Sequence, residues 1–254
     1  MSANTVLIIG AHHEEVEAEF PNTVVALAAA GCRIVILNPV GGWNWTAIRS
    51  MENGRERTIC DALAAASKLG CEKIIWDYPI GQLPCYRNEV LPRMAELLVD
   101  LRPEIVLIHW AEDIHPDHRA VAAFSRLAIS SGAANLCQNL TKKWMPQEVY
   151  AFQTGPGQAY HFTPDILVKT DAKTMAIADE AIECFRNTMP ESVETWKTNF
   201  HTKAEYWGNL AGSPAEAFRF LGPMLPLDGF LLRKILGNRI VTWYTSSFTQ
   251  YSEF

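Results

Sequence analysis

The sequence predicts an α/β protein whose mostly parallel sheet is covered by helices on both faces. Short apolar runs alternate with longer segments of helical periodicity along the first half of the chain. Each run is apolar along its whole length rather than at every second residue, as in parallel strands that are buried on both sides. This alternation of strands and helices is typical of a doubly wound sheet.

Glycine and proline mark the boundaries of the expected elements in the first half. Strands are expected at residues 5–10, 33–37, 73–76 and 104–109. Helices are expected at residues 16–30, 50–69 and 89–101. The first two of these helices are followed by Gly31 and Gly70, and glycine is common just after the last residue of a helix.

The second half continues the same pattern less regularly. A loop that runs into a helix is expected at residues 115–131, and strands are expected at 149–153 and 166–169. Two further helices are expected at 173–186 and 193–210, and a final strand at 239–244. No repeat or linker divides the chain. We therefore expect one α/β domain over residues 1–221, with residues 222–254 as a C-terminal extension packed on the same domain.

Composition excludes several classes of protein. The 254 residues carry a formal net charge of −6 with acids and bases intermixed, which argues against a nucleic-acid partner. No apolar run approaches the roughly 20 residues of a membrane span, and no signal-peptide pattern opens the chain. We expect a soluble, cytoplasmic protein. Its scattered cysteines contain no C-x-x-C pair and are expected to be reduced thiols: Cys32, Cys60, Cys71, Cys85, Cys137 and Cys184.

Two polar clusters follow strands of the predicted sheet. The first strand runs into residues 11–17 (AHHEEVE), and the fourth strand precedes residues 112–119 (EDIHPDHR). Open α/β sheets bind ligands at the carboxyl ends of their strands. No G-x-G-x-x-G and no phosphate-binding loop occupies those ends here. The first and fourth strands can be neighbours at the switch point of such a sheet, so the two clusters can face each other.

These clusters contain the residue types of a catalytic zinc site. Such a site takes three protein ligands and leaves a fourth position for water. His12 and Glu15, three residues apart, form a close pair, and His118 supplies a distant third ligand. Zinc lowers the pKa of its bound water toward about 7. Glu14 is then the candidate general base, and His115 can polarise or protonate the substrate.

Other interpretations of the same residues stay open. Asp117 or Asp113 can hold His115 in one tautomer. The acidic residues after the first strand can also simply complement the positive end of a helix dipole. The segment from His115 to His118 can be a plain loop entering a helix, with Pro116 in its first turn.

The two clusters resemble the motifs of the PIG-L/LmbE-like family of zinc-dependent de-N-acetylases, which are N-acetylglucosaminyl deacetylase-like enzymes. The residues that carry the likeness are AHHEEVE after a strand and DIHPDHRA, at 11–17 and 113–120. Weaker likeness extends it to about residues 5–220. The resemblance implies a Rossmann-like three-layer αβα fold and a Zn²⁺ cofactor.

The resemblance also assigns roles to residues. It makes His12, Glu15 and His118 the metal ligands, Glu14 the general base and His115 the stabiliser of the intermediate, with Asp117 in the same motif. The implied reaction removes an acetyl or similar acyl group from a small-molecule N-acylated sugar or sugar conjugate through a zinc-activated water. The implied enzyme class is a hydrolase acting on C–N amide bonds. A homo-oligomer is among the alternatives for the oligomeric state.

The sequence departs from the family pattern at several positions. The usual first motif is AHPDDE, so His13 replaces a proline, while Glu14 and Glu15 each replace an aspartate and lengthen it by one methylene. Ile80 replaces an aspartate that often contacts the sugar. The candidate substrate contacts are Asp77 as a stand-in for that aspartate, Arg55 or Arg57, and Trp43, with Trp45 of the same loop as a further candidate for the wall of a sugar site.

Two other functions remain as alternatives. The altered motif can belong to a catalytically inactive relative that binds a ligand or partner. Two histidines and one carboxylate are also the facial triad of non-haem iron oxygenases. That triad usually sits on a β-sandwich, which the strand–helix alternation does not suggest.

Overall fold

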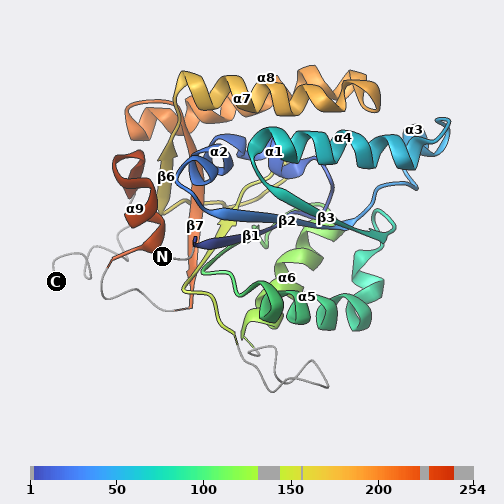
Figure 1. Ribbon diagram of the computed structural model, residues 1–254, viewed down its shortest axis with the longest axis horizontal. Coiled ribbons are helices and arrows are strands. Elements are labelled where there is room, and N and C mark those ends of the chain that lie inside the picture. The colour runs from blue at the N-terminus through green and yellow to red at the C-terminus, as the bar shows by residue number, and fades with distance from the viewer. Residues whose placement is uncertain (1–2, 131–143, 156, 224–228, 243–254) are drawn as a thin grey trace.

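A single eight-stranded sheet forms the centre of the computed structural model, which describes residues 3–130, 144–155, 157–223 and 229–242 (Figure 1). The strand order is β3-β2-β1-β4-β5-β7-β6-β8. The strands are β1 (Thr5–Ile9), β2 (Arg33–Val40), β3 (Glu72–Tyr78), β4 (Ile105–His109), β5 (Glu148–Phe152), β6 (Ile166–Lys169), β7 (Ala215–Gly222) and β8 (Ile240–Thr242).

The sheet has a parallel part and an antiparallel part. Strands β3, β2, β1, β4 and β5 are parallel to their neighbours. Strand β7 pairs antiparallel with β5 and with β6, and β8 pairs antiparallel with β6. The expected α/β fold with a mostly parallel sheet is confirmed. Strand β1 lies between β2 and β4, so the chain changes direction there, and this is the predicted switch point.

Helices cover both faces of the sheet (Figure 1). One face carries α5 (Arg87–Leu101) and α6 (Pro116–Ser130). The other carries the helices α1 (Glu15–Glu19), α2 (Pro21–Ala29), α4 (Gly54–Leu69), α7 (Ala172–Glu183) and α8 (Pro190–Ala211). Shorter elements are α3 (Thr46–Arg49), η1 (Leu83–Tyr86), η2 (Cys184–Asn187), α9 (Leu231–Leu236) and η3 (Gly237–Arg239).

Strand β1 shows why its sequence is apolar throughout. Leu7 and Ile9 pack in the core beneath α5 and α6, whereas Val6 and Ile8 pack in the core on the α2 side. Successive side chains of a strand point to opposite faces, so a strand between two helical layers needs an apolar residue at every position.

The first predicted helix, at residues 16–30, is in fact two helices. Helix α1 ends at Glu19 and α2 begins at Pro21, with Phe20 between them at φ −153°. Proline lacks an N–H and disfavours a helical conformation in the residue before it, so the break falls at Phe20. The separate α1 begins at Glu15, at the carboxyl end of β1.

The antiparallel strand β7 was not predicted from the sequence. Its second residue, Glu216, is buried, and a buried acid obscures the apolar pattern of a strand. The Glu216 carboxylate accepts hydrogen bonds from the backbone N–H and the side chain of both Asn22 and Thr23, at 2.6–2.9 Å. These residues lie in the first turn of α2, so Glu216 satisfies N–H groups that a helix leaves unpaired.

The described part of the C-terminal segment packs on the same sheet. Strand β8 extends the sheet beside β6, and the backbone N–H of Leu232 in α9 donates to Glu148 of β5 at 3.0 Å. Cys137 and the end of the expected strand at residues 239–244 lie outside the described residues. Among the helices described, none combines the length and apolarity that a membrane crossing requires.

We expect Glu216→Gln to lower the free energy of unfolding by about 2 kcal/mol, because an amide NH₂ would face donors that now meet a carboxylate oxygen. Urea unfolding followed by circular dichroism measures this change. Glu205→Gln, at an exposed position of α8, is the matched control and should be nearly neutral. Equal stability of the two variants would contradict the role given to Glu216.

Candidate metal centre

The adjacency of β1 and β4 brings the two predicted clusters together. Gly10 and Ala11 lead from β1 into His12, and a Cβ on Gly10 would lie 3.1 Å from the Asn38 side chain. The buried Asn38 amide donates to the carbonyl oxygens of Gly10 and His12, at 3.1 and 2.5 Å. The end of β2 therefore fixes the loop that carries His12, and the glycine allows this close approach.

Glu15 and two imidazoles converge on one point. The Glu15 Oε1 atom lies 2.7 Å from His12 Nδ1 and 2.5 Å from His118 Nε2. The two ring nitrogens are 3.4 Å apart. Glu15 begins α1, and His118 lies in the first turn of α6. All three side chains are buried.

The opposite ring nitrogens are held by carboxylates. Asp117 Oδ2 lies 3.1 Å from His12 Nε2, and Asp113 Oδ2 lies 3.0 Å from His118 Nδ1. We expected one of these aspartates to orient His115 instead. Asp117 Oδ2 is 3.9 Å from His115 Nδ1, so its shorter contact is with His12. Each aspartate thus fixes the ring whose other nitrogen faces Glu15.

Backbone and hydroxyl donors hold the two aspartates in place. Asp117 accepts from the N–H of Gly81 at 2.6 Å and of Leu83 at 3.0 Å. Asp113 accepts from the N–H of His115 at 2.7 Å and from the hydroxyl of Thr154. Burial raises the pKa of both carboxyl groups, but these bonds and the adjacent imidazoles lower it below the usual range.

His109 is a site residue that the sequence reasoning did not include. It ends β4, is fully buried, and places Nε2 2.8 Å from Glu15 Oε2 and 2.8 Å from the Ala11 nitrogen. Burial lowers the pKa of His109. The available signal was a histidine that directly follows four apolar residues of a buried strand, next to the segment that supplies His118.

The electrostatics of this cluster favour positive charge near Glu15. Burial lowers the pKa of His12 and His118, but the Glu15 charge and carboxylate hydrogen bonds prevail and raise these pKa values to about 10 and about 9. Burial raises the pKa of Glu15, yet three neighbouring imidazoles hold it well below its usual range. A carboxylate that is buried among imidazoles is stable only with a compensating cation.

A cavity of about 270 Å³ opens onto the cluster. It is lined by His12, Glu14, Glu15, His115 and His118, together with Trp45, Ile80, Met189, Ser192 and Trp196. Burial raises the pKa of Glu14 to about 7, and burial together with the neighbouring imidazoles lowers the pKa of His115 to about 4. His115 Nδ1 accepts from the Asp117 N–H at 3.2 Å, which leaves the proton of the neutral ring on Nε2.

His13, the residue in place of the family's proline, also lines the cavity and is buried. Its ring lies 6.3 Å from that of Trp43 in a stacked arrangement, and its Nδ1 is 3.4 Å from Glu14 Oε2. Lys73 donates to the His13 carbonyl at 2.6 Å and forms a fully buried ion pair with Glu17. The backbone beside Glu14 is therefore fixed from β3.

The three expected substrate contacts lie together but do not line this cavity. The Arg55 guanidinium lies 3.5 Å from Asp77 and 5.2 Å from the centre of the Trp43 ring. Trp45, the further candidate from the same loop, and Ile80 line the cavity. The correct end of the sheet was identified, but which side chains point inward depends on the loop conformation.

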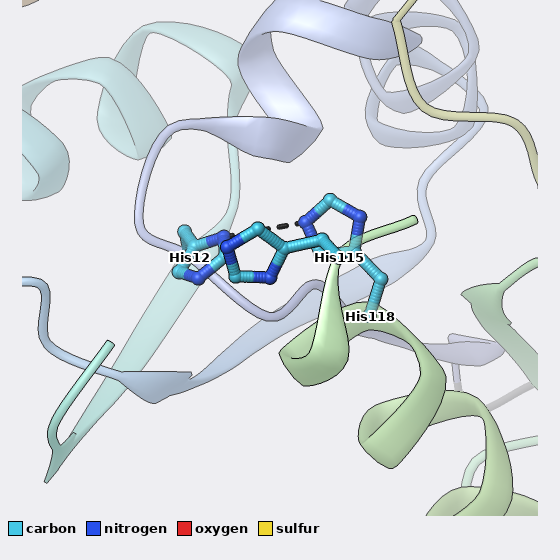
Figure 2. A group of neighbouring side chains, drawn as sticks. All are labelled: His12, His115 and His118. Atoms are coloured by element: carbon cyan, nitrogen blue, oxygen red, sulfur yellow. Dashed lines mark hydrogen bonds between the residues drawn. The ribbon is translucent and has the colours of Figure 1, made fainter. Parts of the chain in front are cut away.

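The donor atoms fit a small divalent cation. One donor atom each from His12, His115 and His118 lies within 4.8 Å of the others, and the same holds for Glu15, His109 and His118. Figure 2 shows the first group, with His12 approaching from the loop after β1 and the other two rings from the start of α6. In the His12–Glu15–His118 set the facing donor atoms lie 2.5–3.4 Å from one another, and both imidazoles have the carboxylate neighbours that are typical of metal-bound histidines.

Residues 7–129 match the family model described as GlcNAc-PI de-N-acetylase, PIG-L. The chain is similar to this family over these residues, which make up slightly less than half of its length. The matched segment contains both polar clusters, from His12 to His118. No curated protein sequence matches the chain significantly.

Several solved structures share the fold of this chain. The 4-carboxy-2-hydroxymuconate hydratase GalB from Pseudomonas putida KT2440 is 20% identical, with a TM-score of 0.73 over 88% of this chain and 98% of that one. The N,N′-diacetylchitobiose deacetylase from Pyrococcus horikoshii is 20% identical, with a TM-score of 0.72 over 87% and 84%. A zinc-inhibited form of the teicoplanin deacetylase Orf2 is 12% identical, with a TM-score of 0.67 over 87% and 100%. At these identities the likeness establishes the fold, and the named proteins include both deacetylases and a hydratase.

Proposed function

We propose that this protein is a metal-dependent hydrolase that removes an acetyl group from an N-acylated sugar or sugar conjugate. The main support is the convergence of His12, Glu15 and His118, with each imidazole braced by an aspartate, at the floor of a cavity that also exposes Glu14 and His115. The name of the matching family and the deacetylases among the structural neighbours point to the same reaction.

His12, Glu15 and His118 are the proposed ligands of one divalent ion, for which Zn²⁺ suits two imidazoles and a carboxylate. Such an ion would lower the pKa of a bound water toward about 7, so that hydroxide is available near neutral pH.

Glu14 and His115 supply the remaining chemistry. Glu14 lines the cavity, and among the described residues its Oε2 atom makes no hydrogen bond and has only the 3.4 Å contact with His13 Nδ1, so the carboxylate can take a proton from the attacking water. The water oxygen adds to the amide carbonyl carbon, and the C–N bond breaks as Glu14 returns the proton to the leaving nitrogen. Acetate and a free amine result. The His115 Nε2–H can donate to the carbonyl oxygen while it carries negative charge.

The sugar part of the proposal rests on weaker observations. Trp45 and Trp196 line the cavity, and indole rings offer flat apolar surfaces against which a sugar face can pack. The printed names of the family and of the Pyrococcus horikoshii neighbour both refer to N-acetylated sugars. The particular sugar is left to the experiments below.

Glu14→Gln should reduce kcat by about 10²–10⁴-fold, because the amide cannot accept the proton of the attacking water. The measurement is acetate release from N-acetylglucosamine and its conjugates by the zinc-loaded protein. Glu96→Gln, at an exposed position of α5, should retain full activity. A wild-type protein that releases no acetate from any N-acetylated sugar would exclude the proposed reaction.

Asp113→Asn should weaken zinc affinity by about 10–100-fold, because a neutral amide holds the His118 ring less firmly than a carboxylate does. Competition with a chromophoric chelator measures the affinity. Asp100→Asn, exposed at the end of α5, serves as the control. Unchanged affinity in Asp113→Asn would show that His118 is not held for metal binding.

A further inference from the structure

A second cavity, of about 420 Å³, lies beside the first. Its lining comes from the loop after β5 and from α8, and consists of Gln153, Ala159, His161, Phe162, Thr202, Lys203, Tyr206 and Trp207. The mechanism above uses none of these residues.

The two cavities share a wall. The Lys203 ammonium bonds to the carboxylate of Glu19, which lines the metal-centre cavity, and also to the Gln153 carbonyl at 3.2 Å. Within the loop, Thr154 faces the metal-centre cavity while Gln153 faces the second one. The Lys203–Glu19 ion pair and the backbone of Gln153 and Thr154 therefore lie between the two cavities.

Helix α8 runs along both cavities. Ser192 and Trp196 line the metal-centre cavity, and Lys203 and Tyr206 line the second. Trp196 and Lys203 are seven positions apart, which corresponds to about 10 Å along a helix axis. A ligand with two rings has to extend over this distance to occupy both cavities.

The lining of the second cavity suits a flat ring with an apolar face. Phe162, Tyr206 and Trp207 form a connected aromatic group, with centroid distances of 6.1 Å and 4.8 Å to the Trp207 ring. Tyr206 is 64% exposed, although it is a large aromatic residue on a helix that packs against the protein. An aromatic surface that is left open in this way is available to a ligand.

Two features of the lining favour a ligand site over a plain hollow in the surface: an unpaired side-chain oxygen and an unusual backbone conformation. The Oε1 atom of Gln153 is buried and has no hydrogen-bond partner among the described residues, which is costly unless a donor arrives. His161 adopts a positive φ of 53°, a conformation that is rare outside glycine and that tends to occur at binding sites.

We propose that the second cavity binds a second ring of the substrate, linked to the N-acetylated sugar whose amide lies at the metal centre. This inference rests on the proposed function, because that function places the first ring. The second ring packs on Tyr206 and Trp207, and one of its polar hydrogens donates to Gln153 Oε1. A further sugar and an aromatic group linked to the sugar share this ring chemistry.

Calorimetric titration tests the proposal in the full-length, zinc-loaded Glu14→Gln protein, in which binding is measured without turnover. The probes are N-acetylglucosamine, N,N′-diacetylchitobiose and 4-nitrophenyl N-acetylglucosaminide. At least one two-ring probe should bind about tenfold more tightly than the single ring, as expected for one aromatic packing contact. Preference for the second or the third probe identifies the second ring as a sugar or as an aromatic group.

Substitutions of Tyr206 in the same protein locate the effect. Tyr206→Ala should remove most of the two-ring advantage and leave the single-ring affinity unchanged, and Tyr206→Phe should keep the advantage. Leu210→Ala, one turn further along α8 and outside the cavity, is the control. The proposal is overturned if all three probes bind equally, if none binds, or if the advantage survives Tyr206→Ala.

The binding experiment and the acetate-release experiment can fail independently of each other. A two-ring advantage that depends on Tyr206, in a protein that releases no acetate, would retain the subsite and reject the deacetylase. Acetate release with equal affinity for all three probes would retain the deacetylase and reject the subsite.

Discussion

The Glu15 carboxylate is buried among three imidazoles, and the arrangement of the site depends on this contact. Its two oxygens meet His12 from the loop after β1, His109 from the end of β4 and His118 from α6. A buried charge must be paired, so these three segments cannot move apart without leaving the carboxylate uncompensated. The break of the chain at Phe20 contributes, because it makes α1 a separate short helix that begins at Glu15.

Much of this arrangement follows from local sequence. Uniformly apolar strands predicted the parallel half of the sheet, and the polar residues after the first and fourth strands predicted that His12, Glu15 and His118 would meet. The ring partners were not predictable in the same way. Asp117 or Asp113 was expected to hold His115. Asp113 instead lies against His118 and Asp117 against His12, which depends on how the imidazoles are rotated in three dimensions.

The remainder of the site comes from parts of the fold with weaker sequence signals. Strand β7 carries the buried Glu216, and this acidic residue interrupts the apolar pattern that would identify a strand. The same carboxylate connects β7 to α2 through hydrogen bonds. The cavity walls come from α8 and from the loops after β2, β3 and β5, so Trp45 and Trp196 line the cavity while Trp43 and Arg55 do not. Such choices depend on loop conformation and long-range packing, which residue spacing does not encode.

The most direct test of the account is the zinc content of the purified wild-type protein and of His118→Ala, measured by mass spectrometry after equilibration with zinc. The geometry predicts about one zinc ion per chain in the wild type and a large loss in His118→Ala, with circular dichroism confirming that the variant is folded. A folded wild-type protein that retains no zinc, or a His118→Ala protein that retains it fully, would contradict the assignment of His12, Glu15 and His118 as a metal centre.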